Sequence, residues 1–144
     1  MPTQNFKNHF RIVPIWHFVT SLAILAAIIG SFVNLSVSWN DHDNFYSSSL
    51  ICLVTLILAI FYVYIRSNSL RVQDRVIRAE ENLRHYILNG KLPDSRLTMK
   101  QTIALRFAPD EELGKLSKRA VDENLNAQEI KKAIVNWKED TYRV

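Results

Sequence analysis

The chain contains two long runs of residues without a formal charge, separated by a short polar segment. The first run extends from Ile12 to Asn40 and the second from Phe45 to Ile65. The second run has 21 residues. A helix of that length spans ~30 Å at ~1.5 Å per residue, which is the thickness of the hydrocarbon core of a bilayer. The pattern therefore predicts a hairpin of two transmembrane helices, at about residues 15–37 and 45–65.

A cleaved signal peptide is an alternative interpretation of the first run, because Lys7 and Arg11 precede it. However, the run is longer than the apolar region of a usual signal peptide, and no small-x-small cleavage site precedes polar sequence at its end. We therefore interpret the first run as an uncleaved membrane anchor.

The charged residues around the two runs predict an orientation. Lys7 and Arg11 precede the first run, Arg66 directly follows the second, and the segment between the runs carries only Asp41 and Asp43. Short loops rich in Lys and Arg stay in the cytoplasm. Both termini are therefore predicted to be cytoplasmic and the acidic loop to lie outside. In a bacterium this topology predicts a multi-pass protein of the inner membrane with its loop in the periplasm.

Small and weakly polar residues recur at helical spacing along both predicted spans. Membrane helices associate through such residues, because lipid is as apolar as leucine and small residues allow close packing. In an antiparallel hairpin the two sets fall at matching depths, and Asn34 is predicted to hydrogen bond to Ser48 or Ser49. The predicted hairpin seam consists of Ala23, Ala27, Gly30, Asn34, Ser48, Cys52, Thr55 and Ala59.

The sequence after Ile65 keeps a helical pattern without Gly or Pro until Gly90. The second span is therefore predicted to continue as a helix to about Asn89, with Pro93 confirming the stop. Apolar residues recur on this extension at spacings of four, three, four and three, as in a heptad repeat. We call these residues the apolar stripe: Val72, Val76, Ala79, Leu83 and Tyr86.

Three shorter amphipathic helices are predicted beyond the long one. Thr98 and Gln101 fit a capping box at the start of the first, and Pro109 begins the second. Asn126 and Glu129 fit a capped start for the third. None of these helices can bury its apolar face alone, so we expect them to pack as a small cluster against the long helix.

These patterns together predict an all-α membrane protein. Residues 1–65 form the N-terminal segment and the transmembrane hairpin, and residues 66–144 form a small cytoplasmic helical module. The mean hydropathy near zero averages these two unlike parts. A module of about eighty residues has a marginal core, so the pattern leaves open whether the apolar stripe is part of that core or an interface.

The sequence contains no motif for a catalytic, metal or cofactor site. It lacks a phosphate-binding glycine loop, a zinc-spaced Cys/His set and a G-x-S-x-G elbow. The single cysteine, Cys52, lies within the second run, which excludes an intramolecular disulfide. His17 is the only histidine in either span, so we predict no haem or proton-relay role for it. The protein is expected not to be an enzyme and to need no cofactor.

Basic residues cluster where the long helix leaves the membrane. Each Lys or Arg near an anionic leaflet contributes ~1 kcal/mol of attraction. The basic residues of the tail alternate with acidic ones, so nucleic-acid binding is not expected. The candidate contacts to anionic lipid are Arg66, Arg71, Arg75 and Arg78.

Several local motifs resemble a family of short two-pass membrane proteins from Bacteroidota that is known as a domain of unknown function. The resemblance covers nearly the whole chain and implies a location in the bacterial inner membrane, but no catalytic residues. The segments that carry it are residues 4–9, 82–86, 90–91, 96–98, 104–107, 110–112, 130–134, 137–138 and 142–144, together with Gln101 and Asp140.

The predicted function is that of a non-enzymatic accessory or scaffold subunit. Its partners would be the lipid bilayer and either a larger membrane complex or another copy of the chain. The alternative is a membrane-anchored sensor or binding module for anionic lipid, a small ligand or nucleic acid. A transporter subunit built by oligomerising the hairpin is a further variant. The candidate partner contacts are Val72, Val76, Leu83, Tyr86, Trp137 and Tyr142.

Overall fold

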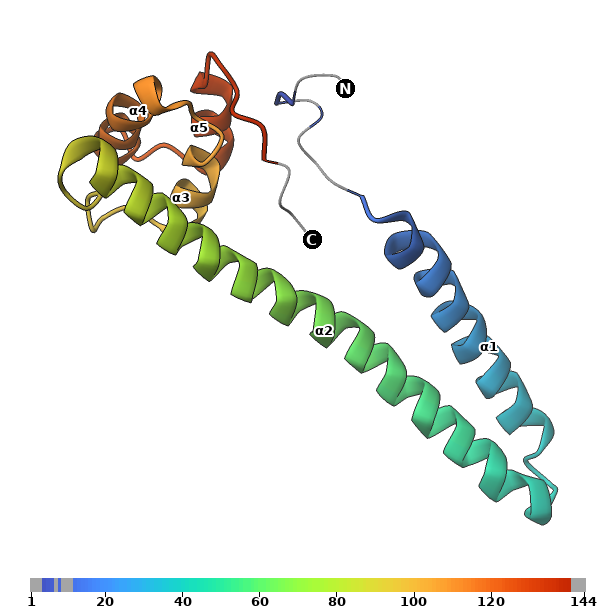
Figure 1. The fold of residues 1–144 in the computed structure, drawn as a ribbon. Helices are drawn as coiled ribbons and strands as arrows, with labels where there is room; N and C mark the ends of the chain where they lie inside the picture. Colours follow the sequence, from blue (N-terminus) through green and yellow to red (C-terminus); the bar gives the residue numbers. More distant parts are fainter. Residues whose placement is uncertain (1–3, 7, 9–11, 141–144) are drawn as a thin grey trace. The chain divides into compact units, whose positions relative to one another are not determined.

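The computed structural model describes residues 4–6, 8 and 12–140, and these residues form helices and no strand. The prediction of an all-helical fold is therefore confirmed for the described part of the chain. The chain divides into two compact units, one of residues 12–69 and one of residues 1–11 with 70–144. The helices in Figure 1 are η1 (Ile15–Thr20), α1 (Ser21–Val37), α2 (His42–Asn89), α3 (Met99–Leu105), α4 (Asp110–Asp122) and α5 (Ala127–Ala133).

The first predicted span corresponds to η1 followed directly by α1. Pro14 precedes the first turn, where its missing N–H costs nothing. The opening turns, Ile15–Thr20, are π-helical. In addition, the Thr20 hydroxyl donates to the Ile15 carbonyl at 3.0 Å and the Ser21 hydroxyl to the Trp16 carbonyl at 3.3 Å. Together η1 and α1 form a continuous apolar helix of 23 residues.

The second predicted span lies in α2, which begins three residues before the predicted start at Phe45. The Asp41 carboxylate accepts hydrogen bonds from the backbone N–H of Asp43 and from the Asn44 side chain. The Asn44 side chain is the main reason that the pKa of Asp41 is lowered. The helix ends at Asn89, as predicted, and Gly90 follows with a φ of 69°, a left-handed conformation that glycine adopts without strain.

Both of these helices are long and apolar enough to cross a membrane. Large apolar side chains are exposed on each, including Leu22, Ile29, Ile57 and Ile60. The core helix of a soluble protein buries such side chains, whereas a membrane helix presents them to lipid. The two helices are therefore candidate membrane spans.

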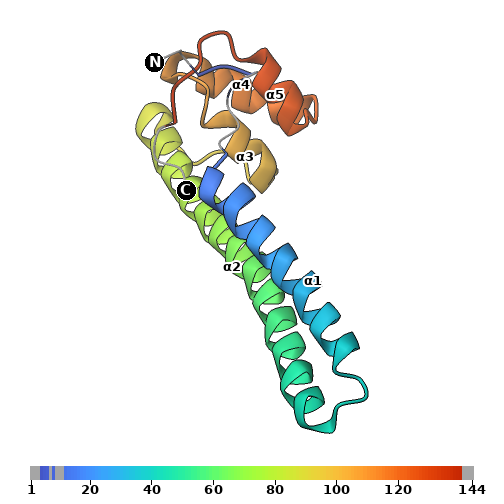
Figure 2. The same ribbon diagram turned by 90° about the vertical axis from the view of Figure 1, so that its right-hand side faces the viewer.

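Within residues 12–69, α1 and the first part of α2 run antiparallel side by side (Figures 1 and 2). Near the loop, the hydroxyl oxygens of Ser38 and Ser48 lie 2.9 Å apart. At the other end, the Ser21 and Tyr62 hydroxyls lie 2.6 Å apart, and the Tyr62 ring stacks on Trp16 with centroids 4.4 Å apart. Polar side chains therefore join the two helices at both ends of the hairpin.

The four α1 residues of the predicted hairpin seam do not lie on the buried face of α1 in the structure. Ala23, Ala27, Gly30 and Asn34 are all exposed. Among the described residues, Asn34 bonds to neither Ser48 nor Ser49. The Ser48 hydroxyl instead lies near the Ser38 hydroxyl and the Asn44 carbonyl, and the Ser49 hydroxyl donates to the Tyr46 carbonyl. The residues of α1 and of the position after it that are buried or half-buried are Ser21, Ile24, Ile28, Ser31, Leu35 and Ser38.

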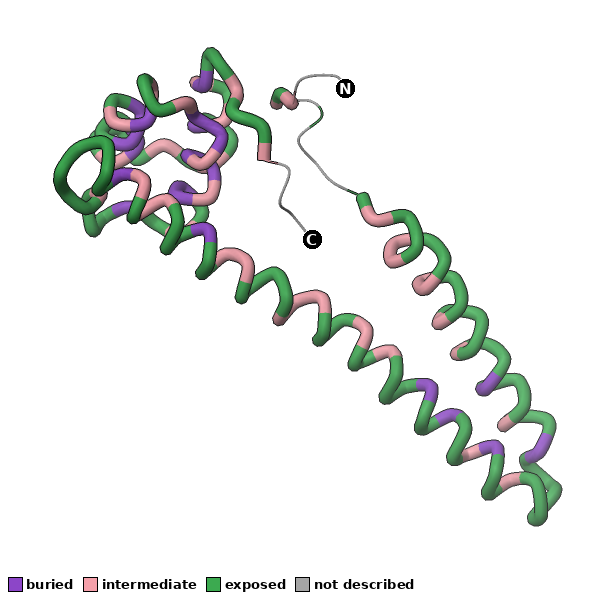
Figure 3. The backbone as a smooth tube through the Cα atoms, viewed as in Figure 1, coloured by how far each residue is buried: buried purple, intermediate pink, exposed green. Residues whose placement is uncertain are grey.

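The α2 half of the predicted seam differs from the α1 half. Ser48, Cys52 and Thr55 are buried and Ala59 is half-buried, so the predicted α2 half faces inward. Figure 3 shows these buried positions on the first part of α2. On α1 the side chains that face inward are Ile24, Ile28 and Leu35, together with the small Ser21 and Ser31. The prediction that Ala23, Ala27, Gly30 and Asn34 form the α1 half of the seam is therefore wrong.

The structure makes a testable prediction about adjacent positions on α1. A Cβ added at Gly30 would have no atom within 4 Å beyond its chain neighbours and the nearby backbone of its own helix, so Gly30→Leu should leave the thermal unfolding midpoint in mild detergent unchanged. Ser31 is buried, so Ser31→Leu should lower the midpoint, because overpacking costs ~1–3 kcal/mol. A larger loss of stability in the Gly30 variant would favour the seam predicted from the sequence.

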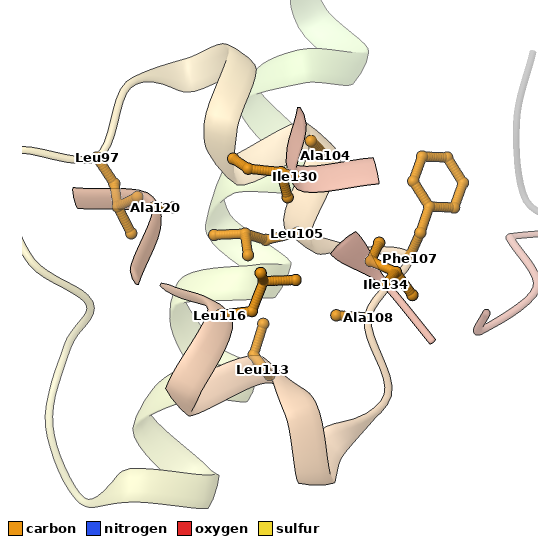
Figure 4. Packing of buried hydrophobic residues seen from close by; sticks show 10 residues of the cluster. All are labelled: Leu97, Ala104, Leu105, Phe107, Ala108, Leu113, Leu116, Ala120, Ile130 and Ile134. Atoms are coloured by element: carbon orange, nitrogen blue, oxygen red, sulfur yellow. The ribbon is translucent and has the colours of Figure 1, made fainter. Parts of the chain in front are cut away.

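The core of the second unit lies between α3, α4 and α5 (Figure 4). The predicted capping boxes are confirmed: Thr98 pairs with Gln101 at the start of α3, and Asn126 pairs with Glu129 at the start of α5. Buried Gln101 also donates to the carbonyls of Ala120 and Leu125 at 3.2 and 2.9 Å. The buried core residues are Leu97, Ala104, Leu105, Phe107, Ala108, Leu113, Leu116, Ala120, Ile130 and Ile134.

Candidate interaction surface on α2

The last part of α2 contacts the module through one face. Ile77 and His85 are its buried residues, and the His85 Nδ1 lies 2.9 Å from the Lys91 carbonyl oxygen. Because that oxygen can only accept, Nδ1 carries the hydrogen. The helix is thus packed against the loop that follows it.

Arg84 holds this face of α2 to the segment between α3 and α4. Its guanidinium donates to Glu81 at 3.0 Å, to Asp110 at 2.7 Å and to the Ala108 carbonyl at 2.7 Å. The side chains of Arg84 and Glu81 are each only 13% exposed. A charge in such a position is stabilised only while its partners remain in place, so Arg84 is the main polar link from α2 to the module.

The apolar stripe lies on a different face and is exposed. Val72 is 61% exposed, Val76 50%, Leu83 60% and Tyr86 53%, and Ala79 is exposed as well. At ~100° per residue the stripe lies roughly opposite Ile77. Figure 3 shows how exposed residues dominate this end of α2. The module packs on the Val72–Tyr86 helix as the sequence predicts, but it does not cover the apolar stripe.

The remaining candidate partner contacts do not join this surface. Trp137 is half-buried and packs on Phe107, with ring centroids 5.0 Å apart, at the edge of the module core. Trp137 therefore serves the module's own packing. Tyr142 lies outside the described residues.

The four candidate lipid contacts are divided between the two units. Arg66 belongs to the unit of residues 12–69, whereas Arg71, Arg75 and Arg78 belong to the other. The latter three are exposed and recur at spacings of four and three, so they share one face of α2. In the part of the chain that the structure describes, none of the four is in an ion pair.

A polar cavity of about 460 Å³ lies between the end of α2, the following loop and α4. Buried His85 and Ser117 line it, together with residues of both charges. Hydrogen bonds from Arg96 lower the pKa of Asp94 at its rim to about 2. Among the described residues, no group of three or more His, Cys, Asp or Glu side chains could hold a metal ion. The mixed charge of the cavity does not select a ligand class.

Comparison with known proteins places the whole chain in one family. The model of a family of unknown function, DUF6526, matches residues 1–144. The chain belongs to this family. No curated protein and no solved structure matches the chain.

For this member of DUF6526, the sequence predicts the apolar stripe of α2 but leaves open whether the stripe is exposed. The spacing of the apolar stripe is visible in the sequence. In the structure the stripe is exposed, because the opposite face of α2 contacts the module through Ile77 and through the bonds from Arg84 to Asp110 and to the Ala108 carbonyl. Asp110 and Ala108 lie more than twenty residues away from Arg84 along the chain, and no local pattern signals that contact.

Proposed function

We propose that this protein is a non-enzymatic, two-pass protein of the inner membrane of Bacteroidota, with both termini in the cytoplasm. It acts as an accessory or scaffold subunit that binds another protein through α2. The two candidate spans support the membrane location. The orientation is supported by the acidic loop between the spans and by the basic residues on both outer flanks.

The observation that carries the docking role is the exposure of the apolar stripe. Exposed apolar patches on folded proteins mark interaction sites. A helix that shows apolar residues at spacings of three and four binds a groove or another helix with that face. The stripe is long enough to offer five such side chains on one side of α2.

A second function, binding of anionic lipid at the cytoplasmic leaflet, is favoured by the shared face of Arg71, Arg75 and Arg78. Each contributes ~1 kcal/mol of attraction near an anionic surface. This attraction needs no pocket, and it is compatible with a protein partner on the neighbouring apolar face.

Purification of the native protein in a gentle detergent, followed by mass spectrometry, tests the scaffold role. We expect a stoichiometric protein partner or a stable homo-oligomer. The double variant Val76→Glu, Leu83→Glu should lose it, because the charges lie on the docking face. Gln128→Glu, on an exposed position of α5, is the matched control and should retain the partner. Recovery of the unaltered protein as a lone monomer, with no partner retained or crosslinked in cells, would contradict the proposal.

A further inference from the structure

We propose that the partner of the apolar stripe is a second copy of this chain, and that two α2 helices pair in parallel through it as a short coiled coil. This inference rests on the proposed docking function and specifies its partner. It concerns only the part of α2 between Val72 and Tyr86, all of which lies in one unit.

The stripe has the geometry of a coiled-coil seam. Spacings of four and three place Val76 and Leu83 at a positions and Val72, Ala79 and Tyr86 at d positions of a heptad. All five are exposed. The small Ala79 in the centre allows the two helix axes to approach closely. A second α2 helix therefore fits this face with the same residues on both sides, as a two-fold interface requires.

The charges beside the stripe are complementary between two copies. In this register Arg75 occupies a g position and Glu80 the e position five residues later. In a parallel pair, a g residue of one helix faces the e residue of the next heptad on its partner. Arg75 of each copy would then face Glu80 of the other. Both side chains are exposed. Neither forms an ion pair within the part of the chain that the structure describes.

The same charges select the parallel orientation. In an antiparallel pair, g positions face g positions and e positions face e positions. Arg75 would then lie near Asn82, and Glu80 would have no basic partner at the seam. Insertion of both copies into one bilayer in the same orientation also brings their α2 helices together in parallel. The charge pattern and the membrane anchor thus favour the same arrangement.

Cysteine crosslinking in the native membrane tests the pairing directly. The full-length chain with Cys52→Ser carries one new cysteine, and a mild oxidant is added to membranes at native expression. Val76→Cys and Leu83→Cys should each give disulfide-linked dimers, because equivalent a residues meet across a parallel seam. Arg78→Cys, which is exposed on another face of α2, should give few.

Charge reversal on the Leu83→Cys background tests the register. Arg75→Glu alone and Glu80→Arg alone should each lower the crosslinked fraction several-fold, because like charges then face each other. The two reversals together should restore it. A merely structural effect of either substitution would not be rescued by the other.

Two results would overturn the inference. One is equal crosslinking at all three cysteine positions, which would indicate random collision; the other is no crosslinking at either stripe position. If a different protein is still purified with the chain and lost in Val76→Glu, Leu83→Glu, the docking function stands while self-pairing fails. If no partner of either kind is found, both proposals fail.

Discussion

Replacing Phe107 with alanine should unfold most of the module formed by α3, α4 and α5. Phe107 belongs to the core cluster (Figure 4) and is fully buried, as Ile130 is. Its ring packs against Trp137. Removing such a ring costs about 3–5 kcal/mol, through lost burial and the cavity that remains. A small domain is stabilised by only about 5–15 kcal/mol. We therefore expect this variant to have the largest effect of any single truncation in the module.

Limited proteolysis and thermal unfolding of the full-length protein in mild detergent measure this effect. Val135→Ala is the control, because Val135 directly follows Ile134 of the core but is itself exposed. It should unfold like the unaltered protein, whereas Phe107→Ala should be cleaved within residues 91–140 at much lower protease concentration. Equal resistance of the two variants would show that the core does not form as described.

Replacing Arg84 with methionine should release the module from α2. The substitution keeps most of the aliphatic length but removes the donors to Glu81, Asp110 and the Ala108 carbonyl. The Glu81 carboxylate would then be left in a poorly solvated position, and breaking such a pair costs about 3–5 kcal/mol when it is buried. Because Asp110 is more than half exposed, we expect the lower end of this range.

Hydrogen exchange of the full-length protein measures the effect of Arg84→Met. Faster exchange should appear in α3 and α4 and in the last turns of α2. Arg78→Met is the matched control, since Arg78 is exposed and in no ion pair within the described residues. Similar exchange in the two variants would mean that the Arg84 contacts contribute little to the stability of the module.

Much of the helix content could be predicted from the sequence because the signals are local. The lengths of the two uncharged runs predict the two spans. Gly90 directly follows the end of α2, and the capping boxes of Thr98 and Asn126 mark the starts of α3 and α5. Each of these depends on residues within one or two turns. The boundaries therefore agree with the prediction to within a few residues.

The faces of the helices could be predicted less well, because they depend on what packs across from them. On α1, the small residues around Gly30 suggest one face, whereas the structure turns the helix so that the adjacent Ser31 is buried. On α2, the spacing of the stripe that includes Leu83 fits either a core or an interface. The stripe lies outside the core because the opposite face, with Ile77 and Arg84, contacts the module. The spacing of residues along one helix does not show which residues of another helix pack against it.

Site-directed labelling of intact spheroplasts tests the central claim, a membrane hairpin that presents α2 and its module to the cytoplasm. In a Cys52→Ser background, Asn44→Cys lies in the first turn of α2, next to the loop, and Ser95→Cys lies in the module; both positions are exposed. We predict that a membrane-impermeant maleimide labels the Asn44 variant in intact spheroplasts and the Ser95 variant only after permeabilisation. Equal labelling of the two variants in intact spheroplasts would contradict the account.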